Sequence, residues 1–590
     1  MQDLISFYTD KLTVYNTQLS KVKQQLFASS MARLVVFVLA AVGLYLVYGN
    51  AQYMIAVILG TIVCFLFLVS RHTNLQYRRD KIIALKKANE TEIAVLKRDF
   101  HGLPDGDEFK DSLHFFSQDI DLFGKGSFYQ YLNRTVLPQG SETLANIFME
   151  NKIDHIDAKQ KAIAELAALP EWRQEFSAVA SLVKTETHYV AILDWLAQYK
   201  AFLPRPMKYL PIVFSIISLL AIIGFFIVPL SIMTLLVVFL VGLGITGIYV
   251  KSIGKLSSDT GRIQSTFHQY QKLILEIENI EFSSELLKQK RAQVVKDGIT
   301  TSEILKEFSK ILSALDQRNN MLFGFIANGF VLWDIRQSYK IERWIEKNGA
   351  SVANWFETIA FFDAYNSLGN FAFNHPKYTY PVLNDDGITL ESIGAGHPLL
   401  DPKKSVLNDF KVSKEQFFII TGANMAGKST FLRTVSLQIV MANTGLPLCA
   451  TSVTYSPIKL ITSMRTTDSL TDDESYFFSE LKRLKFVVDE IQNDRYFIVL
   501  DEILKGTNST DKAKGSRKFV EKLVRSKSTG IIATHDLSLC EVADELPQVQ
   551  NHYFDAEIID DELHFDYKFK DGICQNMNAS FLLKKMEIVD

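Results

Sequence analysis

The stretch from Ile419 to Thr430 reads IITGANMAGKST, and it decides how the C-terminal part of the chain folds. Phe417–Ile420 has the apolar pattern of a buried strand, and Thr430–Met441 continues as a helix. Between them, Gly422–Ser429 fits G-x-x-x-x-G-K-[ST], the pattern of a phosphate-binding loop. In such a strand–loop–helix unit, backbone N–H groups and the N-terminus of the helix hold phosphates.

The loop predicts ATP and Mg²⁺ as cofactors. In this loop type the lysine, here Lys428, reaches the β- and γ-phosphates, and the following hydroxyl, here Ser429, binds Mg²⁺. Nucleotide contacts are expected from the whole loop, namely Gly422, Ala423, Asn424, Met425, Ala426, Gly427, Lys428, Ser429 and Thr430.

Two further apolar strands end in polar side chains suited to hydrolysis. Tyr496–Leu500 is followed by Asp501 and Glu502, and Gly530–Ala533 is followed by Thr534 and His535. We expect Asp501 to hold Mg²⁺ through water, Glu502 to polarise the attacking water, and His535 to sense the γ-phosphate or orient that water. Any one of these residues could be a surface group or a helix cap. Three strand ends in this order predict an ATP-hydrolysing domain with Lys428, Glu502 and His535 as its catalytic residues.

Two long uncharged stretches predict membrane helices. No charged residue lies between Arg33 and Arg71, or between Lys208 and Lys251. As a single helix each stretch would be roughly 55–65 Å long, about twice the thickness of a bilayer core. Two hairpins fit better, with turns at 49–52 and 228–231. The predicted spans are 32–48, 53–70, 209–228 and 232–250. A buried hairpin in a soluble core is the alternative, but such helices usually carry a polar stripe.

Basic residues flank both hairpins, whereas the turns carry no charge. The positive-inside rule therefore places every long segment in the cytoplasm, on a multi-pass protein of the cell (inner) membrane. The flanking residues are Arg33, Arg71, Arg78, Arg79, Lys81, Lys200, Arg205, Lys208, Lys251 and Lys255.

The N-terminal segment shows a heptad pattern. Apolar residues recur three and four positions apart, at Ile5, Tyr8, Leu12, Tyr15, Leu19, Val22 and Leu26, and a looser stripe follows the first hairpin. We expect either that the hairpin continues as two packed antiparallel helices, or that an amphipathic helix lies on the main body. The pattern does not separate the two.

Chain length, net charge and cysteine content exclude few classes of protein. A chain of 590 residues has room for roughly four domains. Its net charge of −3 is too small to imply nucleic acid by itself. The cysteines are scattered, suit a reducing compartment and predict no metal site.

The loop TGANMAGKST is similar to T-G-P-N-M-G-G-K-S-T of the MutS family, the DNA mismatch-repair ATPases. Gly126–Thr135 resembles the opening of the family's helical lever region, and Phe361–Leu368 resembles its end. Other motifs resemble the family's in the same order, namely His397-Pro398, Asn408-Asp409, Ser475–Glu480, Asp501-Glu502 with Gly506-Thr507, Thr534-His535, Tyr567–Gly572 and Asn578–Ser580.

This resemblance implies the architecture. We expect an α/β P-loop NTPase domain of the ABC/MutS-like type at 376–590 and an all-α lever region at 111–375. The second transmembrane hairpin interrupts this lever region. Residues 1–110, with the first transmembrane hairpin, have no counterpart in the family.

The resemblance also implies a homodimer with shared ATP sites. Ser475 would face the γ-phosphate held by the partner subunit, and Tyr567 is the candidate for an aromatic residue near the adenine. Ala423 and Ala426 replace the family's Pro and Gly. Leu504-Lys505 stands where the family has Gly-Arg, which bears on the subunit contacts.

Two functions follow from this architecture. The first is a membrane-anchored MutS-like ATPase, a dimeric switch that binds mismatched or branched DNA in DNA repair. The second is a mechanochemical membrane protein that kept the MutS motor and does not bind DNA. No mismatch-reading domain is found, and the second hairpin lies where the family inserts its DNA clamp. An ABC-type transporter is disfavoured because the L-S-G-G-Q signature is missing.

Overall fold

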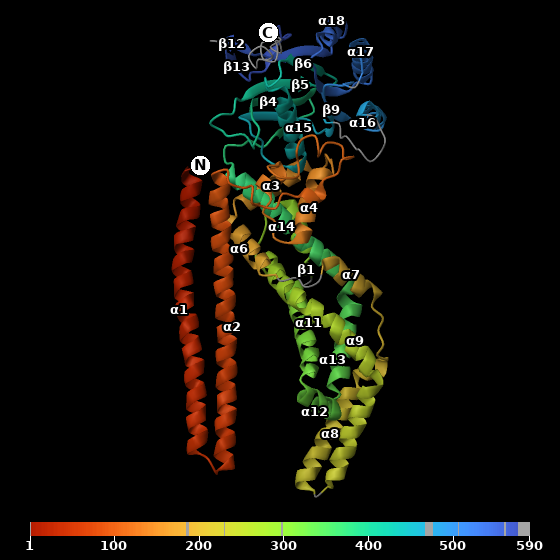
Figure 1. Ribbon diagram of the computed structural model, residues 1–590. Coiled ribbons are helices and arrows are strands. Elements are labelled where there is room, and N and C mark those ends of the chain that lie inside the picture. The colour runs from red at the N-terminus through yellow and green to blue at the C-terminus, as the bar shows by residue number, and fades with distance from the viewer. Residues whose placement is uncertain are drawn as a thin grey trace.

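The computed structural model describes residues 2–183, 188–228, 230–296, 299–465, 476–505, 507–559 and 562–575. The molecule is elongated, with an α/β domain at one end and two helical hairpins that reach the other end (Figure 1). A helical middle region joins these parts.

The first hairpin consists of α1 (Gln2–Leu46) and α2 (Ala51–Leu96). Gly49 turns the chain with a φ of 96°, and the side chain of Asn50 caps α2 by accepting from the Tyr53 backbone N–H. The turn therefore covers 47–50, and α2 begins two residues earlier than the predicted turn at 49–52 allows. Between the apolar segment and the α/β domain, Val22 and Leu26 of α1 pack against Ile82 of α2. Of the two arrangements that the heptad pattern left open, the structure has the packed antiparallel pair.

Helices dominate the middle region. Pro138 and Pro170 each occupy the first turn of a helix, where the missing N–H costs no hydrogen bond. The described helices are α3 (Phe128–Leu132), α4 (Pro138–Met149), α5 (Ile156–Ala167), α6 (Pro170–Ser181), α7 (Tyr189–Gln198), α8 (Leu210–Ile227), α9 (Ile232–Glu278), α10 (Glu285–Ala292), α11 (Thr301–Asp316), α12 (Met321–Val331), α13 (Trp333–Asn348) and α14 (Val352–Asn374), with a small hairpin of β1 (Val295–Lys296) and β2 (Ile299–Thr300).

Helix α14 is the axis of this region. It is buried along almost its whole length and packs against α4, α5 and α6 before it leads into the α/β domain. Asp363 of α14 is fully buried, and its carboxylate accepts the backbone N–H groups of Val136 (3.0 Å) and Leu137 (2.8 Å). This contact fixes the start of α4 to the middle of α14.

Asp363 predicts a pH dependence of stability. Burial raises its pKa to about 7, although the two backbone hydrogen bonds oppose the shift. The folded protein then binds this proton more tightly than the unfolded chain, so the contribution of Asp363 to stability should fall as the pH rises from about 4 to about 7. We expect Asp363→Asn to lose this part of the pH dependence in thermal melts at acidic and neutral pH. Identical slopes for the two proteins would contradict the assignment.

The second hairpin consists of α8 and the first half of α9. Helix α9 runs without a break from the apolar tip into the core, where Phe267 and Tyr270 are fully buried. Near the tip, Gly242 packs on α12. A Cβ at Gly242 would lie 2.3 Å from the Gly329 carbonyl oxygen, so only glycine allows this close approach.

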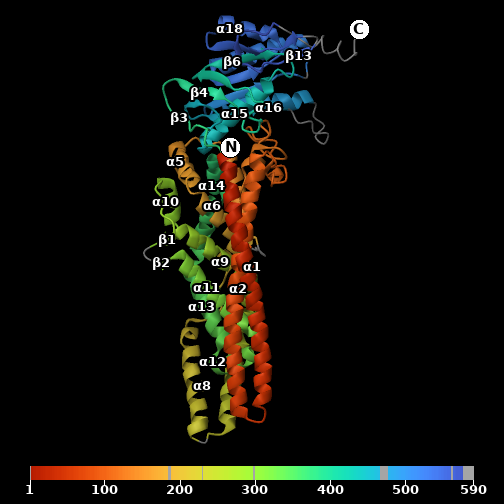
Figure 2. The same cartoon turned by 90° about the vertical axis from the view of Figure 1, so that its left-hand side faces the viewer.

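Four helices, α1, α2, α8 and α9, are long and apolar enough to cross a membrane by length and composition. In their most apolar windows at most 17% of the residues are buried. The tips of both hairpins lie at the end of the molecule opposite the α/β domain in two perpendicular views (Figures 1 and 2).

The C-terminal domain has a six-stranded sheet of order β14-β11-β6-β10-β9-β8 within the described residues. All neighbouring pairs are parallel except β14 with β11. A second described sheet has the order β3-β7-β4-β5. The strands are β3 (Val382–Leu383), β4 (Ile388–Ala395), β5 (Asn408–Ser413), β6 (Phe417–Gly422), β7 (Ser452–Tyr455), β8 (Lys459–Ser463), β9 (Tyr496–Asp501), β10 (Thr529–Ala533), β11 (Val549–Phe554), β12 (Glu557–Ile559), β13 (Glu562–His564) and β14 (Lys570–Asp571).

The helices of this domain are α15 (Lys428–Thr444), α16 (Tyr476–Glu490), α17 (Ser509–Arg525) and α18 (Val542–Glu545). Strand β6 is buried at every position and lies between β10 and β11. Because β6, β10 and β9 run parallel, their carboxyl ends meet at one edge of the sheet. This edge carries the candidate site.

Candidate functional site

The loop between β6 and α15 depends on glycine at two positions. Gly422 and Gly427 have φ values of 148° and 112°, in the region that favours glycine. A Cβ at Gly422 would lie 2.5 Å from the Phe554 carbonyl oxygen. Met425 also has a positive φ of 68°, and its side chain is exposed. The backbone geometry at these two positions therefore requires glycine, in addition to the sequence motif.

Lys428 begins α15 and crosses the loop. Its buried ammonium group donates to the carbonyl oxygens of Gly422 (2.7 Å) and Ala423 (2.9 Å), and it lies 3.3 Å from His535 Nε2. Burial lowers the pKa of Lys428, while the nearby carboxylates Asp501 and Glu502 oppose the shift. The carbonyl oxygens of Gly422 and Ala423 thus hold the Lys428 ammonium group against the loop backbone.

The strand ends bring two further pairs to the loop. Ser429 Oγ donates to Asp501 Oδ2 at 2.7 Å, and His535 Nε2 lies 3.0 Å from Glu502 Oε1. Glu502 has a φ of 50°, which is unusual for a residue with a side chain, and its backbone N–H donates to Ala533 on the neighbouring strand. The parallel pairing of β9 with β10 therefore positions the Glu502–His535 contact.

His535 also sets the electrostatics of Glu502. Its hydrogen bond holds the pKa of Glu502 at about 2 despite partial burial, and its charge, Lys505 and Lys512 act in the same direction. Glu502 is therefore ionised at any physiological pH.

A cavity of about 460 Å³ lies over the loop. It is lined by Ala423–Met425 and Gly427–Thr430 of the loop, together with Asp501, Glu502, Lys505, His535 and Tyr567. The structure thus brings together the predicted residues of all three strand ends. Gly422 and Ala426 belong to the loop but do not line the cavity. Ser475, Gly506 and Asn578–Ser580 lie outside the described residues.

A second cavity of about 460 Å³ shares Gly427, Thr430 and Tyr567 with the first. Its lining mixes apolar side chains, such as Phe431 and Phe554, with polar ones, such as His397 and Asn408. Burial lowers the pKa of His397 to about 4, so this ring is neutral. In the sequence, His397 and Asn408 stand out only as parts of the motifs His397-Pro398 and Asn408-Asp409, which predict no role for either residue.

Asn408 explains the position of Tyr567. The Asn408 side chain donates to the Tyr567 carbonyl oxygen at 3.0 Å and accepts the Phe569 backbone N–H at 2.8 Å. Tyr567 has a φ of 53°, and its ring would lie 3.3 Å from a Cβ at Gly427. The tyrosine therefore stands between the two cavities.

The oxygen groups present fit Mg²⁺ held together with a nucleotide. A hydroxyl and a carboxylate, from Ser429 and Asp501, lie side by side at the loop. Across the described part of the chain, no cluster of three His, Cys, Asp or Glu side chains could hold a metal ion. Mg²⁺ commonly uses one or two carboxylates together with substrate phosphates and water.

Comparison with known proteins places this α/β domain. The family model described as MutS domain V matches residues 418–586. A DNA mismatch repair protein MSH4 of Arabidopsis thaliana is 32% identical over 219 residues, which cover 36% of this chain and 27% of that protein. The MutS protein homolog 4 of Homo sapiens is 28% identical over 39% of this chain and 25% of its own length. A DNA mismatch repair protein MutS of Thermotoga maritima is 31% identical over 37% of this chain and 27% of its own length.

The fold and the family-model match together define the C-terminal part as a mixed α/β domain of the MutS domain V type. It is attached to a helical region. Residues 418–586 are therefore similar to this domain of MutS proteins. The match spans about a quarter of the length of the three relatives named above.

Proposed function

We propose that this protein is an ATP-hydrolysing switch of the MutS type, held at the cell membrane by its two apolar hairpins. The observation that carries the ATPase is the convergence of Lys428, the Ser429–Asp501 pair and the Glu502–His535 pair on one cavity. Each of these groups matches one requirement of phosphoryl transfer to water.

Each residue has a separate task in this proposal. The loop N–H groups and Lys428 bind the β- and γ-phosphates, with the ammonium exchanging its carbonyl partners for phosphate oxygens. Ser429 and Asp501 would hold Mg²⁺, Asp501 through water, and the ion would neutralise phosphate charge. A carboxylate with a pKa of about 2 is a weak proton acceptor, so Glu502 orients and polarises the attacking water. His535 fixes the Glu502 carboxylate in that position.

Tyr567 gives a prediction about base recognition. We expect Tyr567→Ala to weaken ATP binding by about fivefold to tenfold through lost stacking on the adenine, and Tyr567→Phe to retain it. Calorimetric titration with ATP measures the effect, and titration with tripolyphosphate is the control, because that anion has no base. An equal loss for both ligands would place Tyr567 on the phosphates instead.

Membrane anchoring rests on the position of the apolar segments. The four apolar helices reach the same end of the molecule (Figure 1). Most of their large apolar side chains there are exposed, for example Phe37, Leu66 and Phe226. Exposure of so much apolar surface to water is energetically unfavourable, whereas a bilayer would cover it. The charged regions then lie on one side of the membrane, which we propose is the cytoplasmic side.

The relatives named above include proteins of DNA mismatch repair, and this supports a DNA-directed switch. We propose a homodimer with shared ATP sites, to which Ser475 contributes across the subunit boundary, acting on mismatched or branched DNA. One observation favours the second candidate, a mechanochemical membrane protein without DNA. The α8–α9 hairpin occupies the chain position of the family's DNA clamp, and its tip is apolar.

DNA binding separates these two candidates. The detergent-purified protein is titrated with duplex, branched and mismatched DNA over a salt series, and its ATPase rate is recorded. A DNA-directed switch should bind with an affinity that falls steeply between about 50 and 200 mM salt, and its ATPase should respond. If neither binding nor a change in ATPase rate is found, the mechanochemical function stands.

A further inference from the structure

A cavity of about 380 Å³ lies where the first hairpin joins the helical middle region, away from the phosphate loop. One face of α2, the segment 133–136, α6 and α14 enclose it. Small apolar side chains, including Ala84, Ala88 and Ala178, make up part of its wall. This volume lies within the range of sites that bind small molecules.

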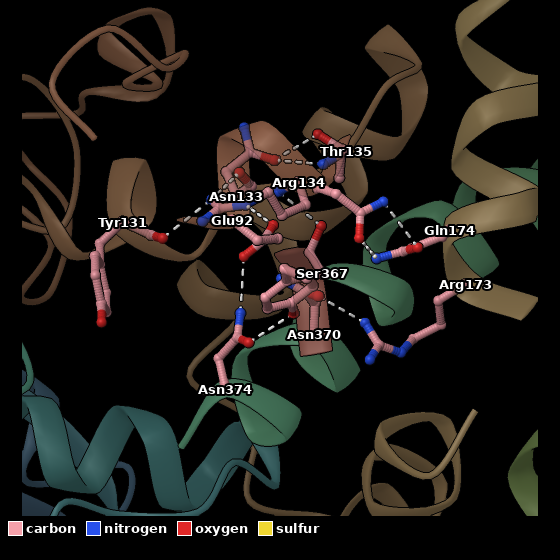
Figure 3. Close-up of polar contacts among 12 residues, drawn as sticks. Glu92, Tyr131, Asn133, Arg134, Thr135, Arg173, Gln174, Ser367, Asn370 and Asn374 are labelled. Atoms are coloured by element: carbon pink, nitrogen blue, oxygen red, sulfur yellow. Dashed lines mark hydrogen bonds and ion pairs between the residues drawn. The ribbon is translucent and has the colours of Figure 1, made fainter. Parts of the chain in front are cut away.

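The cationic side chains that line this cavity outnumber the anionic ones. Glu92 is paired with Arg134 at 2.6 Å and also accepts from the Asn374 amide at 2.8 Å (Figure 3). Two lining cations remain, Arg173 and Lys87. Among the residues that the structure describes, no carboxylate lies within 4.0 Å of either cation. The cavity wall therefore carries a net positive charge.

Arg173 is only 3% exposed, yet it is incompletely bonded. Nε donates to the Leu166 carbonyl (2.7 Å) and Nη1 to Asn370 Oδ1 (2.8 Å), as Figure 3 shows for the latter. Nη2 has no hydrogen-bond partner in the described part of the chain, nor do both amide atoms of the lining residue Asn366. Burial lowers the pKa of Arg173 to about 10, which leaves it charged at neutral pH. Buried donors without partners are costly, and a ligand would recover this energy if the Arg173 side chain turned to meet it, because Nη2 is not solvent-accessible where it stands.

We propose that this cavity binds a small, water-soluble organic anion. Its carboxylate or phosphate group would pair with Lys87 and, once the Arg173 side chain turns toward the cavity, with Arg173, and its body would lie against the alanines of α2 and α6. A lipid headgroup does not fit the location. Lys87 lies about 25 Å along α2 beyond Ser70, the end of the predicted span, at 1.5 Å rise per residue.

The site lies at a joint between the hairpin and the rest of the protein. Tyr8 of α1 donates to Asn374 of α14 at 2.7 Å, and Asn374 in turn donates to Glu92 of α2. The Arg134 backbone N–H donates to Ser367 of α14 at 3.0 Å. Glu92 and Arg134 both line the cavity. A bound anion would therefore contact the groups that fix the hairpin to α14.

The test uses calorimetric titration of the detergent-purified full chain carrying Lys428→Ala, so that the phosphate loop does not take up the probe. The probes are citrate, glucose 6-phosphate and ribose 5-phosphate at millimolar concentrations, with glucose and ribose as uncharged controls. We expect saturable binding of at least one anion and none of either sugar. Absence of saturable binding for all three anions would overturn the proposal.

Variants of α2 locate the binding. Lys87→Gln removes an exposed cation without touching a described hydrogen bond, and Ala88→Phe fills the cavity. Each should weaken binding by about tenfold or more, while Lys86→Gln, on the same helix outside the cavity, should bind like the parent. Unchanged binding in both Lys87→Gln and Ala88→Phe would also overturn the site. Because no ATP is used, failure here would leave the ATPase proposal intact.

Discussion

Lys428→Ala is expected to abolish nucleotide binding and to reduce ATPase activity by about 100-fold or more, because a preorganised cation at the phosphates is lost. The ammonium is buried and already aligned by the Gly422 and Ala423 carbonyls, so its contribution is made in a partly desolvated site. Fluorescence titration with a labelled ATP analogue and a phosphate-release assay measure the two effects. The fold should persist, since the lost hydrogen bonds involve two loop carbonyls and His535, all within the site.

Lys522→Ala is the matched control. This lysine is exposed on α17 of the same domain and lines neither cavity. It should bind and hydrolyse ATP like the parent protein. Normal ATP affinity in Lys428→Ala would contradict the assignment of the phosphate loop.

Glu502→Gln is expected to separate binding from turnover. Glutamine keeps the size of the side chain but loses the charge that orients water, so ATP should still bind while the hydrolysis rate falls by about 100-fold to 1,000-fold. Single-turnover measurements with bound ATP show whether the chemical step is affected. Since the pKa of Glu502 is about 2, the rate of the parent protein should not report its titration above about pH 4.

The control for this charge removal is Glu521→Gln. Glu521 pairs with Arg517 and Arg525 on α17, away from the loop. It should leave the hydrolysis rate unchanged. If Glu502→Gln also hydrolyses ATP at the parent rate, another group orients the water and the proposed role of Glu502 is wrong.

Much of the candidate site could be predicted because its signals are local. The loop from Gly422 to Ser429 carries its glycines, lysine and serine within eight neighbouring positions, and a buried strand precedes it. Asp501 is the last residue of an apolar strand, Glu502 follows it, and His535 lies two residues beyond the end of another such strand. Parallel pairing of those strands then brings them together. The role of Asn408 was not predictable, because Tyr567, whose carbonyl it bonds, lies 159 positions away in the chain.

The sequence by itself determined the strand–loop–helix unit around Gly422–Ser429, the apolar hairpins and the helical character of the middle region. These features depend on the order of neighbouring side chains and on their periodicity. Only the tertiary structure decided that the heptad helices pair with each other and that both hairpins reach one end. It alone revealed the cationic cavity beside α14. Those features depend on contacts such as Tyr8 with Asn374, which join residues 366 positions apart. No local pattern encodes such contacts, because they form only when the whole core packs.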